Sequence, residues 1–324
     1  GVNGGTADAV GLQLDNVDFG LALLSDKANA TRSWTALNVQ ASSVGFVGLS
    51  DLLPTARNIA VEINQASQAG DQVIDFSARG LSVNTGSGKA VNLDLDGSAG
   101  ELLRAEGDIT LKLFDFAYVS GRIGFERYTP ASDLVIKTAS GIGSSVKAQS
   151  MLAVTGSQIT AFVGYADGGF DSDKTLAEQS DRLYGFGASH VDFGLLLTKS
   201  AGQSYTALKA DLGSAAIYGF NSSDFELSAQ HLILEINSTA GDGSTIDYQR
   251  SFNGGLKLGS TGAITLDFAG GQRMGLYAQQ ATLSISKFLY FSGAIGFEKA
   301  DYGNQLKSGL SQTVPVLGAK GFAI

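Results

Sequence analysis

Residues able to perform catalysis are scarce in this 324-residue chain. It contains two histidines, His190 and His231, and no cysteine, so few side chains could activate a nucleophile. No G-x-S-x-G segment presents a serine, and no two carboxylates stand out as the acid and base of a glycosidase. Each histidine is more simply interpreted as a surface or hydrogen-bonding residue. We therefore expect a protein without catalytic residues that is not an enzyme.

Two acidic stretches are the strongest candidates for binding an ion. The segment DGGFDSDK (167–174) supplies Asp167, Asp171 and Asp173, whose carboxylates could coordinate Ca²⁺ together with turn carbonyls. A similar stretch, AGDGSTID, spans 240–247. Neither matches the twelve-residue EF-hand loop, and solvated turn residues explain both more simply. We expect no cofactor, with Ca²⁺ near Asp167, Asp171 and Asp173 as the alternative.

A glycine-rich stretch, TGSGKA (85–90), is an incomplete phosphate-binding loop, because Ala90 stands where serine or threonine is needed and no helix follows. A hairpin turn explains it better, and GSTGA (259–263) occupies the corresponding place later in the chain. Asp94 and Asp267 also correspond. Each of them alternates with leucine, which indicates a carboxylate that faces solvent.

Composition excludes several classes of partner. The net charge is −9 and lysines and arginines form no cluster, so nucleic acid is not expected as a partner. No apolar run reaches the roughly 18 residues of a membrane-spanning helix. The absence of cysteine, a charged fraction of only 16% and 43 glycines are typical of bacterial secreted and surface proteins. We expect an extracellular or cell-surface location, with any targeting sequence outside this chain.

The strongest pattern is an internal repeat, in which matched segments recur in the same order and at nearly constant spacing. The pairs are VDFGLALL (17–24) with VDFGLLLT (191–198), SWTAL (33–37) with SYTAL (204–208), VEIN (61–64) with LEIN (234–237), NLDLDG (92–97) with TLDFAG (265–270), and SGRIGFE (120–126) with SGAIGFE (292–298). We predict two tandem copies, at 1–163 and 164–324. LGAKGFAI (317–324) resembles LAVTGSQI (152–159), so the second copy is expected to end a few residues before the next boundary.

Apolar residues alternate with period two, which predicts β-strands. Because one parity continues through the whole of 108–126, we predict one long strand there, bent at Gly121 where glycine tolerates strain. The apolar parity switches at Asp15–Asn16 and again beside His190, which indicates a β-bulge or a strand that crosses between sheets.

The predicted fold class is all-β, with two tandem copies of a β-rich unit that is either sandwich-like or built from elongated stacked sheets with long strands. The segment LLPTARNIAVEI (52–63) has some helical spacing, but its counterpart in the second copy alternates, so we predict a strand. The only predicted helix is DKTLAEQSDRL (173–183), a surface insertion.

Four residues are predicted to lie at an interface. Asp115 and Lys287 occupy equivalent positions on the otherwise apolar face of the predicted long strand. Because an isolated buried charge is costly, we expect successive units to bring the two together as an ion pair. Trp34 and Tyr205 are also equivalent, and as residues within strands they are expected to pack at an interface or on a sheet surface. Stacking on sugars is the alternative for these two aromatic rings.

The unit defined by VDFGLALL, SWTAL, VEIN, GDITLKLF and SGRIGFE resembles repeats of very large, repetitive bacterial surface proteins of the adhesin type. The resemblance implies secretion, an extended shape and a structural or adhesive role. We therefore expect a structural segment of an extracellular fibre or adhesin, forming a homo-oligomer or filament through strand edges. The alternative is a β-rich module that binds carbohydrate or lipid, in which case a surface glycan is a possible partner.

Overall fold

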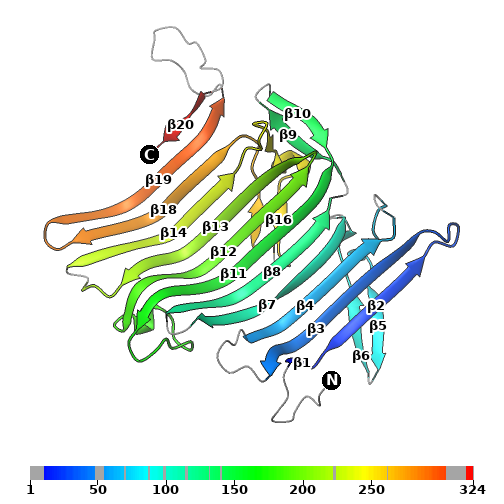
Figure 1. The fold of residues 1–324 in the computed structure, drawn as a ribbon, viewed down its shortest axis with the longest axis horizontal. Helices are drawn as coiled ribbons and strands as arrows, with labels where there is room; N and C mark the ends of the chain where they lie inside the picture. The colour runs from blue at the N-terminus through cyan, green and yellow to red at the C-terminus, as the bar shows by residue number, and fades with distance from the viewer. Residues whose placement is uncertain are drawn as a thin grey trace, which may run out of the picture. The chain divides into compact units, whose positions relative to one another are not determined.

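The structure of the chain is a computed structural model (Figure 1). It describes residues 11–47, 55–68, 71–86, 88–97, 100–113, 116–130, 132–138, 141–221, 224–260, 262–303 and 319–323. Strands make up most of these residues, and the helices whose bounds are described are a 3₁₀ turn, η2 (Ala177–Gln179), and a single turn, α1 (Tyr248–Ser251). No helix in the described ranges has the length and apolarity needed to cross a membrane. The prediction of an all-β fold is confirmed.

The chain divides into two compact units. Unit 1 comprises Gly1–Ala131 and Ser150–Val154, and unit 2 comprises Ser132–Gln149 and Thr155–Ile324. The boundary predicted after residue 163 separates two segments of similar sequence, whereas the two units are defined by their compactness. The repeat boundary therefore stays a prediction.

Unit 1 is built on an antiparallel sheet in which β1 and β2 both pair with β3, followed in order by β4, β7 and β8 (Figure 1). Its strands are β1 (Gly11–Asp15), β2 (Asp18–Ser25), β3 (Ser33–Val47), β4 (Thr55–Ala66), β5 (Leu81–Gly86), β6 (Lys89–Leu93), β7 (Glu101–Leu113) and β8 (Ala117–Thr129). The hairpin β5–β6 is a separate small sheet, inserted in the sequence between β4 and β7.

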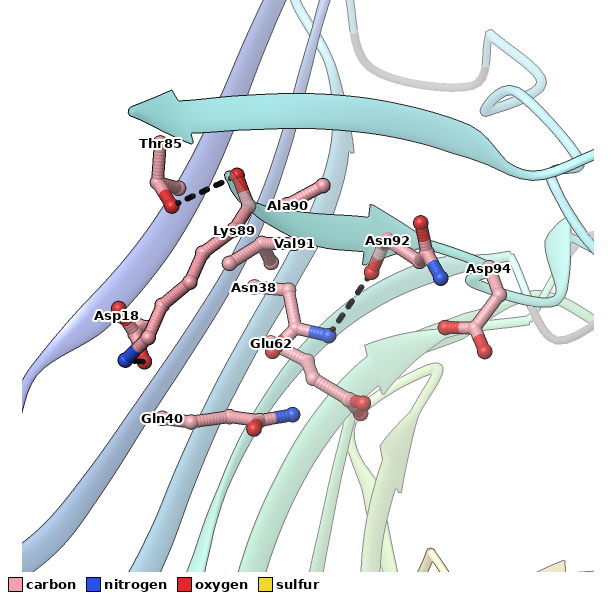
Figure 2. Close-up of a pocket in the computed structure, with 10 residues that line it drawn as sticks. All are labelled: Asp18, Asn38, Gln40, Glu62, Thr85, Lys89, Ala90, Val91, Asn92 and Asp94. Carbon is pink, nitrogen blue, oxygen red and sulfur yellow. Dashed lines mark hydrogen bonds and ion pairs between the residues drawn. The ribbon is translucent and has the colours of Figure 1, made fainter. Parts of the chain in front are cut away.

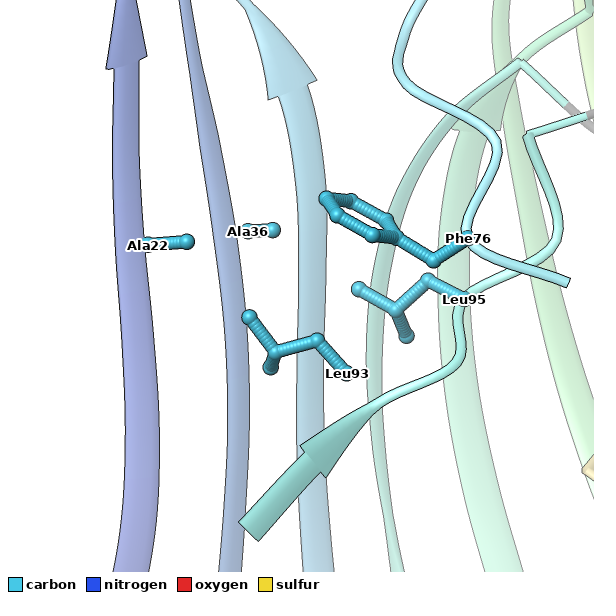
Figure 3. Packing of buried hydrophobic residues seen from close by; sticks show 5 residues of the cluster. All are labelled: Ala22, Ala36, Phe76, Leu93 and Leu95. Atoms are coloured by element: carbon cyan, nitrogen blue, oxygen red, sulfur yellow. The ribbon is translucent and has the colours of Figure 1, made fainter. Parts of the chain in front are cut away.

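The core of unit 1 lies between the sheet and the segment that contains this hairpin. Ala22 on β2 and Ala36 on β3 are buried beneath Phe76, Leu93 and Leu95 (Figure 3). The small side chains of the sheet leave room for the large ones above them, so the two layers interdigitate. This face of the sheet is therefore covered, and it is apolar around Ala22 and Ala36.

The main strands of unit 2 are hydrogen-bonded in an antiparallel sheet in the order β11, β12, β13, β14, β18, β19 and β20. These strands are β11 (Ala148–Ala166), β12 (Leu183–Ser200), β13 (Gln203–Tyr218), β14 (Phe225–Asn237), β18 (Arg273–Ile285), β19 (Leu289–Gly303) and β20 (Ala319–Ala323). Two small sheets accompany it, and they contain β9 (Leu134–Thr138), β10 (Gly141–Val146), β15 (Thr245–Ile246), β16 (Leu256–Leu258) and β17 (Ile264–Leu266). Lengths up to 19 residues confirm the prediction of long strands.

The matched sequence segments lie on strands with corresponding neighbours. The order β2–β3–β4–β7–β8 in unit 1 parallels β12–β13–β14–β18–β19 in unit 2, and each series carries a hairpin, β5–β6 or β16–β17, between its third and fourth strands. Each hairpin approaches its sheet at an equivalent glycine. A Cβ on Gly20 would lie 3.1 Å from Val91, and a Cβ on Gly194 would lie 2.7 Å from Leu258. The origin of the two series in a duplication stays a prediction.

The predicted single long strand over 108–126 is wrong, because this segment contains the end of β7, a turn and most of β8. The two strands form a hairpin in which Leu113 pairs with Ala117 and Ile109 pairs with Gly121. Paired residues share a face of the sheet, and here both partners have odd numbers. The apolar parity therefore continues unchanged through the reversal, which is why the pattern could not reveal it.

The predicted irregularity at Asp15–Asn16 is confirmed. Asn16 lies between β1 and β2 with φ +49°, and His190, its counterpart within β12, has φ +52°. Asn58 and His231, another equivalent pair, have φ +49° and +45°. Asparagine and histidine are enriched among residues with left-handed backbone, so these side-chain types fit a break in the alternation of a strand.

Two further expectations have mixed outcomes. The segment 52–63 was expected to be a strand, and its described part lies in β4, which confirms the prediction. The helix predicted over 173–183 is wrong except for the 3₁₀ turn η2. Helix α1 lacks an amphipathic pattern in the sequence, and it starts where the buried Asp247 carboxylate accepts a hydrogen bond from the Arg250 backbone.

Candidate functional site

The predicted interface residues lie in different environments. Lys287 is exposed in the turn between β18 and β19, and not on the apolar face of a strand. Asp115 lies outside the described residues. Trp34 donates a hydrogen bond to the Gln72 carbonyl (3.0 Å), whereas Tyr205 is buried and its hydroxyl lies 3.0 Å from the Ser244 hydroxyl. Both aromatic rings therefore pack within their own units, and their part in an interface stays a prediction.

The acidic stretch at 167–174 forms a local turn network. The Asp171 carboxylate accepts a hydrogen bond from the Asp173 backbone (3.0 Å), and this bond is the main reason why the pKa of Asp171 is lowered. Lys174 lies 3.4 Å from the same carboxylate. Within the described ranges, no three His, Asp or Glu side chains are grouped as they would be around a metal ion. Ca²⁺ at Asp167, Asp171 and Asp173 stays a prediction.

Neither histidine forms part of a nucleophile–base–acid arrangement with other described residues. His190 Nδ1 lies 3.3 Å from the hydroxyl of its neighbour Ser189, and His231 Nδ1 lies 3.9 Å from the Asp211 carboxylate. Both have left-handed backbone conformations. This backbone conformation, in which histidine is enriched, explains why histidine occurs at both positions without assigning it a catalytic role.

The face of the unit 1 sheet opposite its core is apolar and open. Phe19, Leu21 and Leu23 on β2 are 57%, 44% and 72% exposed, while Ala22 between them is 7% exposed. The pairing of the strands continues this apolar face from β2 across the neighbouring strands in two rows of side chains. One consists of Phe19, Val39, Val61, Ala105 and Phe125, and the other of Leu21, Leu37, Ile63 and Leu103. Single-layer sheets leave such a face without cover.

Strand β2 is also an edge strand among the described residues. It pairs with β3, and no other described strand continues the ladder on its far side. The equivalent strand in unit 2, β12, has neighbours on both sides, β11 and β13. The unpaired edge of β2 thus presents backbone N–H and C=O groups beside three exposed apolar side chains.

On the covered face, each unit holds one arginine between two glutamates. Arg104 contacts Glu126 and lies 2.8 Å from Glu62 in unit 1. In unit 2, Arg273 lies 2.6 Å from Glu235 and 3.4 Å from Glu298. The glutamates are equivalent, but the arginines are not: Gly275, not Arg273, is the residue that pairs with both glutamates of unit 2. Sequence reasoning missed both clusters because the arginine occupies different positions on the two equivalent strands, β7 and β18.

A polar cavity of about 560 Å³ opens between the unit 1 sheet and the hairpin β5–β6 (Figure 2). The residues that line it are Asp18, Asn38, Gln40, Glu62, Thr85, Lys89, Ala90, Val91, Asn92 and Asp94. Lys89 lies 3.7 Å from Asp18, and Asn38 donates a hydrogen bond to the Asn92 carbonyl (3.2 Å). The sequence placed Asp94 in solvent, and it is exposed at the mouth of this cavity. The only feature of the sequence that pointed to this cavity was the equivalence of Asp94 with Asp267.

No family model matches the chain, and no curated protein or solved structure was found to be similar to it.

Proposed function

We propose that this chain is a structural, non-catalytic segment of an extracellular fibre or adhesin, and that copies of it join end to end through strand edges. The observation that carries the proposal is the unpaired edge of β2, with Phe19, Leu21 and Leu23 exposed along it. A long apolar edge strand is a template for another strand, and soluble proteins usually protect such edges with charges or bulges. Among these strand residues, only Asp18 is charged.

The chain itself indicates which strand fits this edge. Strand β12 carries the segment that matches β2, and it pairs with β11. The sequence at 317–324, which contains β20, resembles the part of β11 at 152–159. The β20 segment of a second copy would therefore give β2 the neighbour that β12 already has. Main-chain hydrogen bonds would supply the affinity, and the apolar side chains of the edge would set the register.

Composition supports the location. A chain with no cysteine, little charge and many glycines is typical of bacterial surface proteins, and the strand content is suited to an extended load-bearing element. An extracellular or cell-surface location is part of the proposal.

Self-association is the measurement that tests it. The chain is studied by light scattering after size exclusion over a concentration series, and by negative-stain electron microscopy. The double variant Leu21→Lys/Leu23→Lys adds charge to the edge, and we expect it to remain monomeric where the unaltered chain associates. The matched control is Leu195→Lys/Leu197→Lys, at equivalent positions on β12, which already has two neighbours. A chain that stays monomeric up to millimolar concentration contradicts the proposal, as does an edge variant that associates normally.

The open apolar face favours one alternative, a lipid-binding module. The lateral rows of the unit 1 sheet form a continuous apolar surface, which suits an acyl chain better than a sugar. Titration with a fluorescent fatty acid distinguishes this function from assembly. Saturable binding that is lost in Val61→Lys, on the central strand β4, supports it. Association without fatty-acid binding rules it out.

A further inference from the structure

Equivalent positions in the two units hold a lysine and an asparagine. Asn38 on β3 lies directly across from Glu62 on β4, and Lys209 on β13 lies directly across from Glu235 on β14. The segments around them match, since SWTAL precedes Asn38 and SYTAL precedes Lys209. The same point on the covered face therefore carries an ammonium group in unit 2 and a shorter neutral amide in unit 1.

In unit 2 the lysine completes an ionic cluster. Its Nζ lies 2.9 Å from Asp267 and 3.8 Å from Glu235. Asp267 follows β17 directly, in the hairpin that covers this part of the sheet. One ammonium group thus neutralises two carboxylates, one from the sheet and one from the hairpin.

In unit 1 the corresponding carboxylates are present without that ammonium group. Glu62 is the counterpart of Glu235, and Asp94, one residue beyond β6, is the counterpart of Asp267. Both line the polar cavity shown in Figure 2. Asparagine is shorter than lysine and carries no charge, so position 38 places no ammonium group between Glu62 and Asp94 as Lys209 does between Glu235 and Asp267 in unit 2.

Two acceptors around this cavity, Asn38 Oδ1 and the Asp94 carboxylate, have no donor among the described residues. Asn38 is 6% exposed, its Nδ2 donates to the Asn92 carbonyl, and its Oδ1 has no hydrogen-bond partner in the described part of the chain. Glu62 contacts Arg104 through Oε2. Within the same ranges, the Asp94 carboxylate forms no hydrogen bond or ion pair. A buried acceptor without a donor is costly, so a ligand that donates hydrogen bonds is favoured here.

We propose that the cavity of unit 1 binds an alkylammonium group, held by Asp94, Glu62 and the Asn38 Oδ1 atom. An ammonium group carries three N–H donors, which matches these three acceptors. Its positive charge is attracted by the two carboxylates, as Lys209 is in unit 2. A divalent metal ion fits less well, because Glu62 is already paired with Arg104 and the described residues offer no group of three acidic or histidine ligands.

Titration of the whole chain with n-butylamine, followed by calorimetry and NMR, tests the site. This molecule reproduces the lysine side chain beyond its Cα. We expect saturable binding to one site, weakened about tenfold or more in Asp94→Asn, because a charge-assisted hydrogen bond is lost. Asp94 is exposed, so its change to asparagine leaves the fold intact. n-Butanol, which has the same shape without the charge, should not bind.

Exchanging the residues at positions 38 and 209 gives the sharper test. In Asn38→Lys, the new ammonium group should occupy the cavity and abolish butylamine binding, and the melting temperature should stay the same or rise. Lys209→Asn should open the equivalent site in unit 2 and raise the stoichiometry from one to two. A peptide with one internal lysine and blocked ends identifies the source of the group. Tighter binding of the peptide than of butylamine indicates a polypeptide partner, and weaker binding indicates a free amine.

Three results would overturn the proposal. They are no saturable binding of butylamine, equal binding by the Asp94→Asn variant, and Ca²⁺ that binds and displaces the amine with higher affinity, which would make the cavity a metal site. None of these results depends on whether copies of the chain associate through β2.

Discussion

Arg104 is the residue whose loss should destabilise unit 1 most clearly. It lies between Glu62 and Glu126, and its side chain is 20% exposed while that of Glu126 is 2% exposed. Burial lowers the pKa of the Arg104 guanidinium, but the charges and hydrogen bonds of the two glutamates raise it by more, so the net pKa is above its ordinary value. The charged form is therefore stabilised by the fold, and Arg104→Met would leave Glu126 buried without its main cation.

The expected size of the effect follows from this geometry. Removing one partner of a buried ion pair costs about 3–5 kcal/mol, because the other charge stays desolvated. Glu126 keeps a further interaction, and Arg104 is not fully buried, so we expect the lower end, about 3 kcal/mol. That is a large part of the 5–15 kcal/mol typical of a folded domain. The double variant Arg104→Met/Glu126→Met should recover much of the loss, because it removes both buried charges.

Trp34 provides the assay. It is the only tryptophan in the chain and lies on β3 of unit 1, so its fluorescence during urea unfolding reports on that unit. The control is Lys89→Met, which removes an exposed ion pair with Asp18, where about 0–1 kcal/mol is expected. If Arg104→Met unfolds at the same urea concentration as Lys89→Met, or if the double variant is less stable than the single one, the reasoning is wrong.

Three further predictions follow from burial, backbone conformation and protonation. Phe76→Ala should lower the free energy of unfolding of unit 1 by about 3–5 kcal/mol, measured by urea titration, while Phe116→Ala, which removes a 59% exposed ring, should change it little. Gly164→Ala should lower the melting temperature of unit 2 measured by circular dichroism, because Gly164 has φ +149° and a Cβ there would lie 2.2 Å from a backbone oxygen; an unchanged melting temperature would contradict this. Burial, and then a hydrogen bond to Glu298, raise the pKa of Tyr277 to about 12, so the neutral form stabilises unit 2 fully below pH 10, and this contribution disappears as pH rises towards 12. Urea unfolding at successive pH values should show this alkaline loss in the unaltered chain and a smaller one in Tyr277→Phe.

Much of the local structure could be predicted from the sequence. Alternating apolar residues predicted the strands, and the glycine-rich turns at 85–90 and 259–263 were correctly placed in hairpins. The change of parity at Asp15–Asn16 correctly marked an irregularity between β1 and β2, where Asn16 has φ +49°. These features depend on neighbours in the chain, because side-chain alternation and backbone φ are set within a few residues.

The candidate site could not be predicted in the same way. Asn38, Glu62 and Asp94 lie on three different strands or loops, and only the register of β3 with β4 and the position of the β5–β6 hairpin bring them together. The sequence showed that Asp94 and Asp267 are equivalent, but it gave no sign that a lysine lies beside one and an asparagine beside the other. The contrast became visible once strand pairing placed each of them opposite an equivalent glutamate.

The sequence by itself determined that the chain is all-β, where most strands lie, and which segments of its two halves match. Only the tertiary structure decided where the chain reverses, which face of each strand is covered, and which charges meet. The physical reason lies in the period of two: a hairpin that pairs Leu113 with Ala117 preserves the same odd-numbered pattern as one uninterrupted strand would. The alternation of apolar residues therefore does not show where the chain reverses its direction. Contacts between distant residues depend on the register of the strands and on the layer that packs above the sheet.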